Sequence, residues 1–557
     1  MLPLRLVPVF AAALALSACA ATPSRPVAKV PVPASTAPPR LVVAIAVDQL
    51  SADSFAQYRQ HYTGGFARLQ QGAVFPSAYQ SHAATETCPG HSTLLTGARP
   101  SRTGIIANNW FDPSLARADK RVYCAEDERS PASTSREPAV SAYHLKVPTL
   151  GDRMKAADPA SRNVAVSAKD RAVIMMGGQS IDAAFWWKGG AFVSLEDRVV
   201  PRALQTANSA AAALIAKGAP ALALPPECAA RDRAVQAGSV TIGTGRFAAE
   251  PGKPDGFRVS PRMDTAIADL ALGLVDELQL GKRSATDILS VSFSANDYVG
   301  HAYGTEGAEM CIQMAELDKT LGRFLGQLDA RGIDYVAVLT ADHGGLDAPE
   351  RLDQQALPSA ARADRALLPG ELAKVVTAKT GITVLGPLLY ADGPFGDYYV
   401  SRNLSSAQKA SVVAALLPMI KAHPQVAAVF TAQELAETPV PTTGPQDWTL
   451  RERARASFDP MRSGDFVVLL DRAVVPIPDP SPGYTATHGS PWDYDRRVPL
   501  LFWRKGVAGM EQPAPVETVD IAPTLAAIIG LRVADGAFDG RCLDIDGSAG
   551  NSCEGGK

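Results

Sequence analysis

One pattern along the chain restricts the fold more than any other feature. Short apolar runs rich in β-branched residues recur, and each ends in polar residues: RLVVAIAVDQL (40–50), RNVAVSAKDR (162–171), ATDILSVSFSANDYVGH (285–301) and IDYVAVLTADHGG (333–345). A further apolar run, RVPLLFW, covers residues 497–503, and amphipathic helical patterns at 263–278 and 311–332 lie between the runs. Apolar strands that alternate with amphipathic helices predict an α/β fold, with a largely parallel central sheet flanked by helices. Ligands of such folds bind at the carboxyl ends of the strands.

The first 20 residues predict export. The sequence MLPLRLVPVFAAALALSACA contains an apolar stretch that is too short to span a membrane and that is typical of a signal peptide. Residues 16–19, LSAC, also resemble a lipobox, which would leave Cys19 as a lipid anchor of an outer-membrane lipoprotein. Ordinary cleavage after Ala18 or Ala20 is the alternative, and both alternatives predict a periplasmic or otherwise exported protein without a transmembrane segment.

Residues 21–40 are rich in Pro and Ala and predict a linker. Residues 41–557 are expected to form one catalytic domain. Two segments within it, at about 191–254 and about 358–465, contain no recognisable motif, and we expect them to be insertions that form caps around the site. The chain carries 54 basic and 57 acidic residues, so its net charge of −3 gives no indication of nucleic-acid binding. We expect a monomer that acts on small molecules.

Six cysteines remain after Cys19, an even number that suits disulfides in an exported protein. They are Cys88, Cys124, Cys228, Cys311, Cys542 and Cys553. Fifteen pairings are possible for six cysteines. The one pairing that we predict is Cys542 with Cys553, which would fasten the C-terminal tail.

Polar residues at the expected strand ends form a candidate metal site. The candidate ligands are Asp48, Asp297, His301, Asp342, His343 and His488. Any one of them alone could be a helix cap or a surface residue, but three carboxylates and three imidazoles at the strand ends of one domain could hold two divalent ions. Zinc suits this set, although carboxylate and imidazole also bind manganese and iron. The remaining histidines are expected to be structural, with His91 near the metal ligands: His61, His82, His91, His144 and His423.

The stretch TETCPGHSTLLTG (85–97) predicts a helix whose first residues include Thr87. Pro89 and Gly90 suit its first turn, and the N-terminus of a helix attracts anions. A threonine hydroxyl is a weak nucleophile unless a base or a metal activates it. The stretch alone leaves open whether Thr87 is a nucleophile or only a cap.

Six motifs in this order resemble those of the alkaline phosphatase superfamily: VDQL, TETCPGHSTLLTG, GIIANNWFDP, NDYVGHAYG, TADHGG and ATHGS. The segment around Thr87 is similar to the nucleotide pyrophosphatase/phosphodiesterase branch. Cys88-Pro89-Gly90-His91 is a departure, because that branch commonly has Phe-Pro-Asn-His, and we expect a disulfide or packing role for Cys88. With the C-terminal VETVDIAPTLAAIIGL, the resemblance extends from residue 47 to about residue 531.

The resemblance implies a role for each candidate residue. Asp297, His301 and His488 would hold one zinc ion. Asp48, Asp342 and His343 would hold a second zinc ion, with the Thr87 hydroxyl as a further ligand. A metal, rather than a base, would then activate Thr87 as the nucleophile that forms a phosphothreonine intermediate.

Three further residues bear on the choice between monoester and diester substrates. Asn108 matches an asparagine of the same branch that donates a hydrogen bond to a phosphate oxygen. Lys169 and Arg171, in SAKDRAV, resemble a pair in the phosphate-irrepressible alkaline phosphatases known from sphingomonads. Two cations favour the doubly charged phosphoryl group of a monoester. The resemblance therefore implies an exported alkaline phosphatase of broad specificity, and a nucleotide pyrophosphatase/phosphodiesterase is the alternative.

Overall fold

The computed structural model describes residues 37–196, 198–547 and 551–553. The expected signal peptide, Cys19 and most of the 21–40 linker lie outside these residues. Within the described ranges, no helix is both long enough and apolar enough to cross a membrane.

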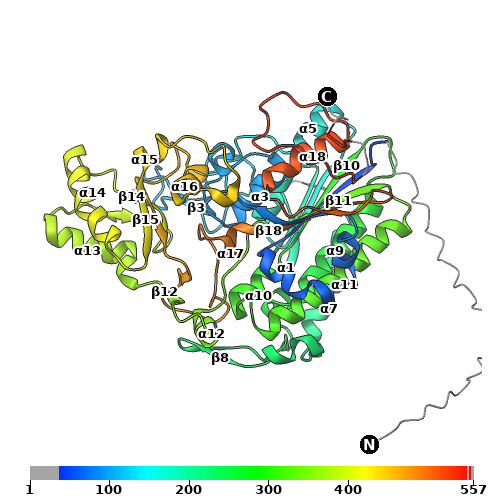
Figure 1. Cartoon of the computed structure of the whole chain (residues 1–557), viewed down its shortest axis with the longest axis horizontal. Helices are drawn as coiled ribbons and strands as arrows, with labels where there is room; N and C mark the ends of the chain where they lie inside the picture. The colour runs from blue at the N-terminus through cyan, green and yellow to red at the C-terminus, as the bar shows by residue number, and fades with distance from the viewer. Residues whose placement is uncertain (1–36, 197, 548–550, 554–557) are drawn as a thin grey trace, which may run out of the picture.

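A ten-stranded sheet lies at the centre of the larger part of the molecule (Figure 1). Its strands are β1 (Leu41–Val47), β2 (Ala73–Tyr79), β5 (Asn163–Ser167), β6 (Ala183–Lys188), β7 (Ala191–Ser194), β10 (Asp287–Phe293), β11 (Tyr335–Thr340), β18 (Arg497–Arg504), β19 (Met510–Glu511) and β20 (Val516–Glu517). Their order is β19-β2-β18-β11-β1-β10-β5-β6-β7, and β20 pairs with β2. The central strands β11, β1, β10, β5 and β6 are parallel, which confirms the predicted α/β fold. The run RVPLLFW becomes β18, which is antiparallel to both of its neighbours, β11 and β2.

Burial explains the apolar runs. All seven residues of β1 and all seven of β10 are buried, because helices cover both faces of the sheet. Figure 1 shows α9 (Pro261–Glu277) and α11 (Ala308–Ala330) along one side, and α5 (Leu150–Ala157) and α18 (Ile521–Ile528) on the other.

The segment expected as an insertion at 358–465 builds a smaller unit beside the main sheet (Figure 1). A four-stranded sheet runs in the order β13-β14-β16-β15, with strands at Leu389–Tyr390, Gly396–Val400, Phe466–Leu470 and Val426–Thr431. Helices α13 (Pro369–Thr380) and α14 (Ser406–Lys421) pack on it, and Leu372, Val412 and Phe466 share its separate apolar core.

The other expected insertion, at 191–254, is partly built into the main body. It begins with β7, which pairs with β6 in the central sheet. Helix α7 (Arg202–Lys217) then packs against α9. The capping role expected of this segment stays a prediction.

Three disulfides join the six cysteines: Cys88–Cys124, Cys228–Cys311 and Cys542–Cys553. The last confirms the pairing expected from the sequence.

Candidate active site

The six predicted metal ligands lie at the carboxyl ends of three adjacent parallel strands or in loops beside them. They are Asp48 after β1, Asp297 and His301 in α10 (Ala295–Tyr303) after β10, Asp342 and His343 after β11, and His488 in the loop before α17 (Asp493–Arg496). Because β10, β1 and β11 are neighbours in register, their ends meet at one edge of the sheet.

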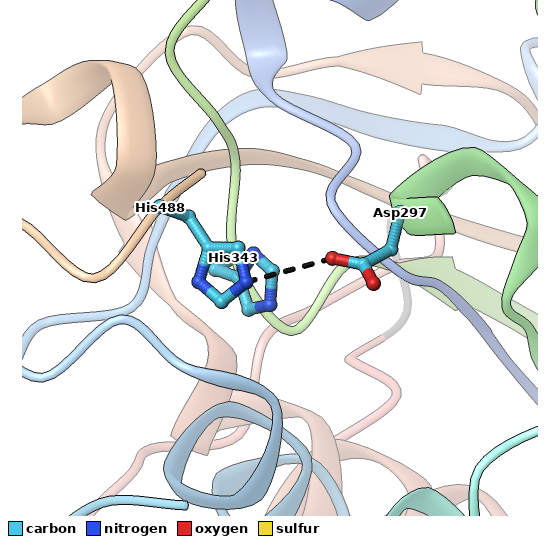
Figure 2. Close-up of side chains that lie close together, drawn as sticks. All are labelled: Asp297, His343 and His488. Carbon is cyan, nitrogen blue, oxygen red and sulfur yellow. Dashed lines mark ion pairs between the residues drawn. The ribbon is translucent and has the colours of Figure 1, made fainter. Parts of the chain in front are cut away.

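The ligand atoms form two groups that share His343. In one group, atoms of Asp297, His343 and His488 all lie within 4.8 Å of one another, and in the other the same holds for Asp48, Asp342 and His343. Figure 2 shows the first group: the two imidazole rings are stacked with centroids 3.6 Å apart, and His488 Nε2 is 3.5 Å from Asp297 Oδ1. His301 lies at the edge of this group, with Nε2 3.2 Å from Asp297 Oδ1. No pattern in the sequence indicates that His343 faces both groups.

The three histidines are held in one tautomer. The Nδ1 atoms of His301, His343 and His488 each lie 2.8–2.9 Å from a backbone carbonyl oxygen, which can only accept a hydrogen bond. Nδ1 therefore carries the proton, and Nε2 presents a lone pair toward the carboxylates. Burial lowers the pKa of His343 well below its ordinary value and also lowers that of His488. These two rings are neutral at pH 7, as metal ligands have to be.

The carboxylates also fit a metal centre. Several buried ligand atoms make no hydrogen bond within the described part of the chain: Asp48 Oδ1, Asp297 Oδ1, Asp342 Oδ2 and His343 Nε2. Burial, and then the charges of Asp297 and Asp342, raise the pKa of Asp48 well above its ordinary value. Three carboxylates packed this closely need positive charge between them. Oxygen and imidazole donors of this kind suit two divalent ions.

Thr87 is the first residue of α3 (Thr87–Thr96) and is completely buried. Two cations approach its hydroxyl: Lys169 Nζ is 3.3 Å and Arg171 Nη2 is 3.4 Å from Thr87 Oγ1. Both follow β5, at the start of α6 (Asp170–Gly177). Lys169 Nζ also lies 2.7 Å from Asp48 Oδ2 and 2.5 Å from Asp297 Oδ2. Burial alone would lower the pKa of Lys169, but these two carboxylates raise it, so the side chain is a cation.

A cavity of about 430 Å³ opens over this group. Asn108, Arg171, His301 and His488 line it on the side of the polar cluster. Aromatic side chains line it elsewhere. Phe395, Tyr399 and Phe458 belong to the smaller unit, and Phe111 and Tyr484 lie outside it. The cavity can therefore hold an anion against the cluster and an organic group against the aromatic residues.

The sequence did not predict the roles of Glu86 and Gly90 in the site, and it predicted only that His91 lies near the metal ligands. Glu86, which precedes Thr87, is half-buried and accepts a hydrogen bond from the Asn108 N–H at 2.8 Å. Gly90 lets α3 approach Asp342, since a Cβ atom there would lie 2.0 Å from the Asp342 carbonyl oxygen. A glycine inside a helix is the signal that could have found this contact. His91 does lie beside the cluster, with Nδ1 3.0 Å from Asp342 Oδ2.

Comparisons with known proteins show the family to which the chain belongs. The model of the type I phosphodiesterase/nucleotide pyrophosphatase family matches residues 42–491. Alkaline phosphatase PhoK of Sphingomonas sp. is 54% identical over 93% of this chain and 93% of its own length. Alkaline phosphatase PhoD of Zymomonas mobilis is 50% identical over 92% of this chain and 89% of its own length.

Solved structures give the same result. The crystal structure of wild-type alkaline phosphatase PafA superposes with a TM-score of 0.79 and 26% identity, over 92% of this chain and 99% of PafA. The chain therefore belongs to the type I phosphodiesterase/nucleotide pyrophosphatase family of hydrolytic phosphoesterases, within the alkaline phosphatase superfamily.

Proposed function

We propose that the protein is an exported alkaline phosphatase that hydrolyses phosphate monoesters of broad specificity through a phosphothreonine intermediate. The observation that carries this proposal is the position of the Thr87 hydroxyl. It lies at a helix N-terminus, within 3.4 Å of both Lys169 and Arg171 and beside two groups of metal-ligating side chains. The names of relatives at 50–54% identity support the same activity.

We infer that Asp297, His301 and His488 hold one zinc ion, and that Asp48, Asp342 and His343 hold a second. His343 belongs to both groups of ligand atoms and would be within reach of either ion. Two bound zinc ions would supply positive charge that lowers the pKa of the nucleophilic hydroxyl and of water and that stabilises the leaving oxygen. Manganese or iron would suit the same donors.

The residues of the chain act on the two ends of the ester. Thr87 Oγ1 attacks phosphorus, the bond from phosphorus to the leaving oxygen breaks, and the alcohol departs with a proton. Water then attacks the phosphothreonine, which releases inorganic phosphate and restores the Thr87 hydroxyl. Lys169, Arg171 and the Asn108 amide hold the non-bridging oxygens during both steps.

The charge of the site favours monoesters. Beside Thr87, Lys169 is buried and Arg171 is half-buried. Both are cationic, because nearby acidic groups outweigh burial and raise their pKa values. A monoester brings two negative charges to this pair, whereas a diester brings one and needs room for a second substituent.

The N-terminal sequence supports a proposal on localisation. We propose that the protein is periplasmic or otherwise exported, with a lipid anchor at Cys19 if the lipobox is used, and that it acts as a monomer. We also propose that the smaller unit around 358–465 caps the site, because Asp392, Phe395 and Asp397 line the cavity.

The alternative is a nucleotide pyrophosphatase/phosphodiesterase, which the family model favours by its description. The test is kcat/KM for an aryl phosphate monoester and for the matching diester, measured on the zinc-loaded protein. A strong monoester preference supports the phosphatase. A diester preference supports the alternative, and hydrolysis of neither ester contradicts both.

A further inference from the structure

Asn108 is held at three of its atoms, and together with Glu86, Cys88 and Cys124 it forms a closed ring of contacts that includes Thr87. Its N–H donates to Glu86 Oε2 at 2.8 Å, and its side-chain Oδ1 accepts from the Cys88 N–H at 2.8 Å. Its carbonyl oxygen accepts from the Cys124 N–H at 3.0 Å. Glu86 and Cys88 are the two residues on either side of Thr87.

These contacts decide which way the Asn108 amide faces. A backbone N–H can only donate, so the amide oxygen points to Cys88 and the amide NH2 group points away from it. Asn108 lines the cavity beside Arg171 and His488. The NH2 group is therefore the end of the amide that is left to donate to an anion there. The bond to Cys88 also satisfies an N–H in the first turn of α3, where the Glu86 side chain makes no capping bond.

A covalent bond closes the ring. Asn108 directly precedes β3 (Asn109–Phe111), which pairs with β4 (Arg121–Tyr123), and Cys124 follows β4. The Cys88–Cys124 disulfide joins the end of this hairpin to the residue after Thr87, and both half-cystines are completely buried. The hairpin that carries Asn108 is thus fastened to the helix that carries the nucleophile.

We propose that the Cys88–Cys124 disulfide is a positioning element of the active site, which together with Glu86 holds the Asn108 amide in place for the phosphoryl group. This inference rests on the proposed function, because it assigns Asn108 to the substrate phosphate. The proposal explains why a cysteine follows Thr87. Cys88 supplies both the N–H that binds Asn108 Oδ1 and the sulfur that binds Cys124.

A double-mutant cycle tests the inference on the zinc-loaded full chain. We expect Cys88→Ala/Cys124→Ala to lower kcat/KM for an aryl phosphate monoester by about tenfold, because a displacement of about 1 Å in a positioned group costs rate. The same change in an Asn108→Ala background is expected to alter kcat/KM by no more than about twofold, since the group that it positions is gone.

The matched control is Cys228→Ala/Cys311→Ala, which removes a disulfide between η2 (Pro226–Arg231) and α11. It should lower Tm and leave kcat/KM within about twofold of the wild type. If the control lowers kcat/KM as much as the test variant does, or if the loss is equal in both Asn108 backgrounds, the inference is overturned.

Circular dichroism shows whether Cys88→Ala/Cys124→Ala folds. If it does not fold, a second variant tests the inference. Glu86→Ala removes the acceptor of the Asn108 N–H without touching a disulfide, and it should show the same dependence on Asn108. An unchanged kcat/KM in this variant overturns the inference. A wild-type protein without monoesterase activity overturns the proposed function as well, whereas activity without coupling to Asn108 overturns the inference alone.

Discussion

Replacing Lys169 by Met separates the charge of the site from its shape. Methionine keeps most of the apolar stem but removes an ammonium group that lies 3.3 Å from Thr87 Oγ1. At about 4 Å and an effective dielectric constant of about 20, one unit charge interacts with an ammonium group by about 4 kcal/mol. The two carboxylates at 2.7 and 2.5 Å from Lys169 Nζ offset part of this interaction.

We therefore expect Lys169→Met to lower kcat/KM for an aryl phosphate monoester by about 10²- to 10³-fold. The matching diester carries one negative charge instead of two, so its kcat/KM should fall by about half as many powers of ten, roughly 10- to 30-fold. The assay compares both esters at saturating zinc, and metal analysis of each preparation separates a catalytic loss from lost zinc. The control is Lys188→Met, which removes an exposed lysine paired with Glu137 and should change neither value. Equal losses for the two esters, at full zinc content, would refute the charge argument.

Four further changes test other parts of the structure. Thr87→Ala should abolish monoester turnover and leave bound zinc detectable by metal analysis; turnover near the wild-type rate would exclude Thr87 as the nucleophile. His343 belongs to both ligand groups, so His343→Ala should lower zinc content at both sites, whereas loss of one ion per chain would assign it to one site. Gly90→Ala would place a Cβ atom 2.0 Å from the Asp342 carbonyl oxygen, and we expect urea unfolding to show a loss of about 1–3 kcal/mol; an unchanged midpoint would show that α3 can shift. Burial lowers the pKa of His82 to about 3, below its unfolded value of about 6.5, so the unfolded chain binds the extra proton between these values. The stability that neutral His82 contributes is present above pH 6.5 and is lost as the pH falls toward 3. The unfolding free energy of the wild type, relative to that of His82→Asn, should therefore fall by about 1.4 kcal/mol for each pH unit in that range. A difference between the two proteins that does not vary with pH would contradict this expectation.

The apolar runs predicted most of the central sheet, because parallel strands that are covered on both faces leave a continuous apolar signature. Their polar ends predicted where the candidate ligands gather. The direction of β18 could not be read from RVPLLFW, since an apolar run carries no information on which way the strand points.

Contacts between distant segments account for the rest. Asn108 meets Glu86 and Cys124 only because the β3–β4 hairpin folds back onto α3, and the sequence alone left the partners of Cys88 and Cys124 open. His343 serves two ligand groups because the ends of β1, β10 and β11 converge, which no spacing within one segment reveals. The smaller unit contributes aromatic side chains to the cavity from residues that carry no motif.

The stereochemical course of phosphoryl transfer tests the central claim most directly. An isotopically chiral aryl phosphate is hydrolysed in the presence of an acceptor alcohol, and the configuration of the transferred phosphate is determined by NMR. Attack by Thr87 followed by attack of the alcohol inverts phosphorus twice, so the account predicts net retention. Net inversion would mean that the acceptor attacks the substrate directly, and it would contradict a nucleophilic Thr87.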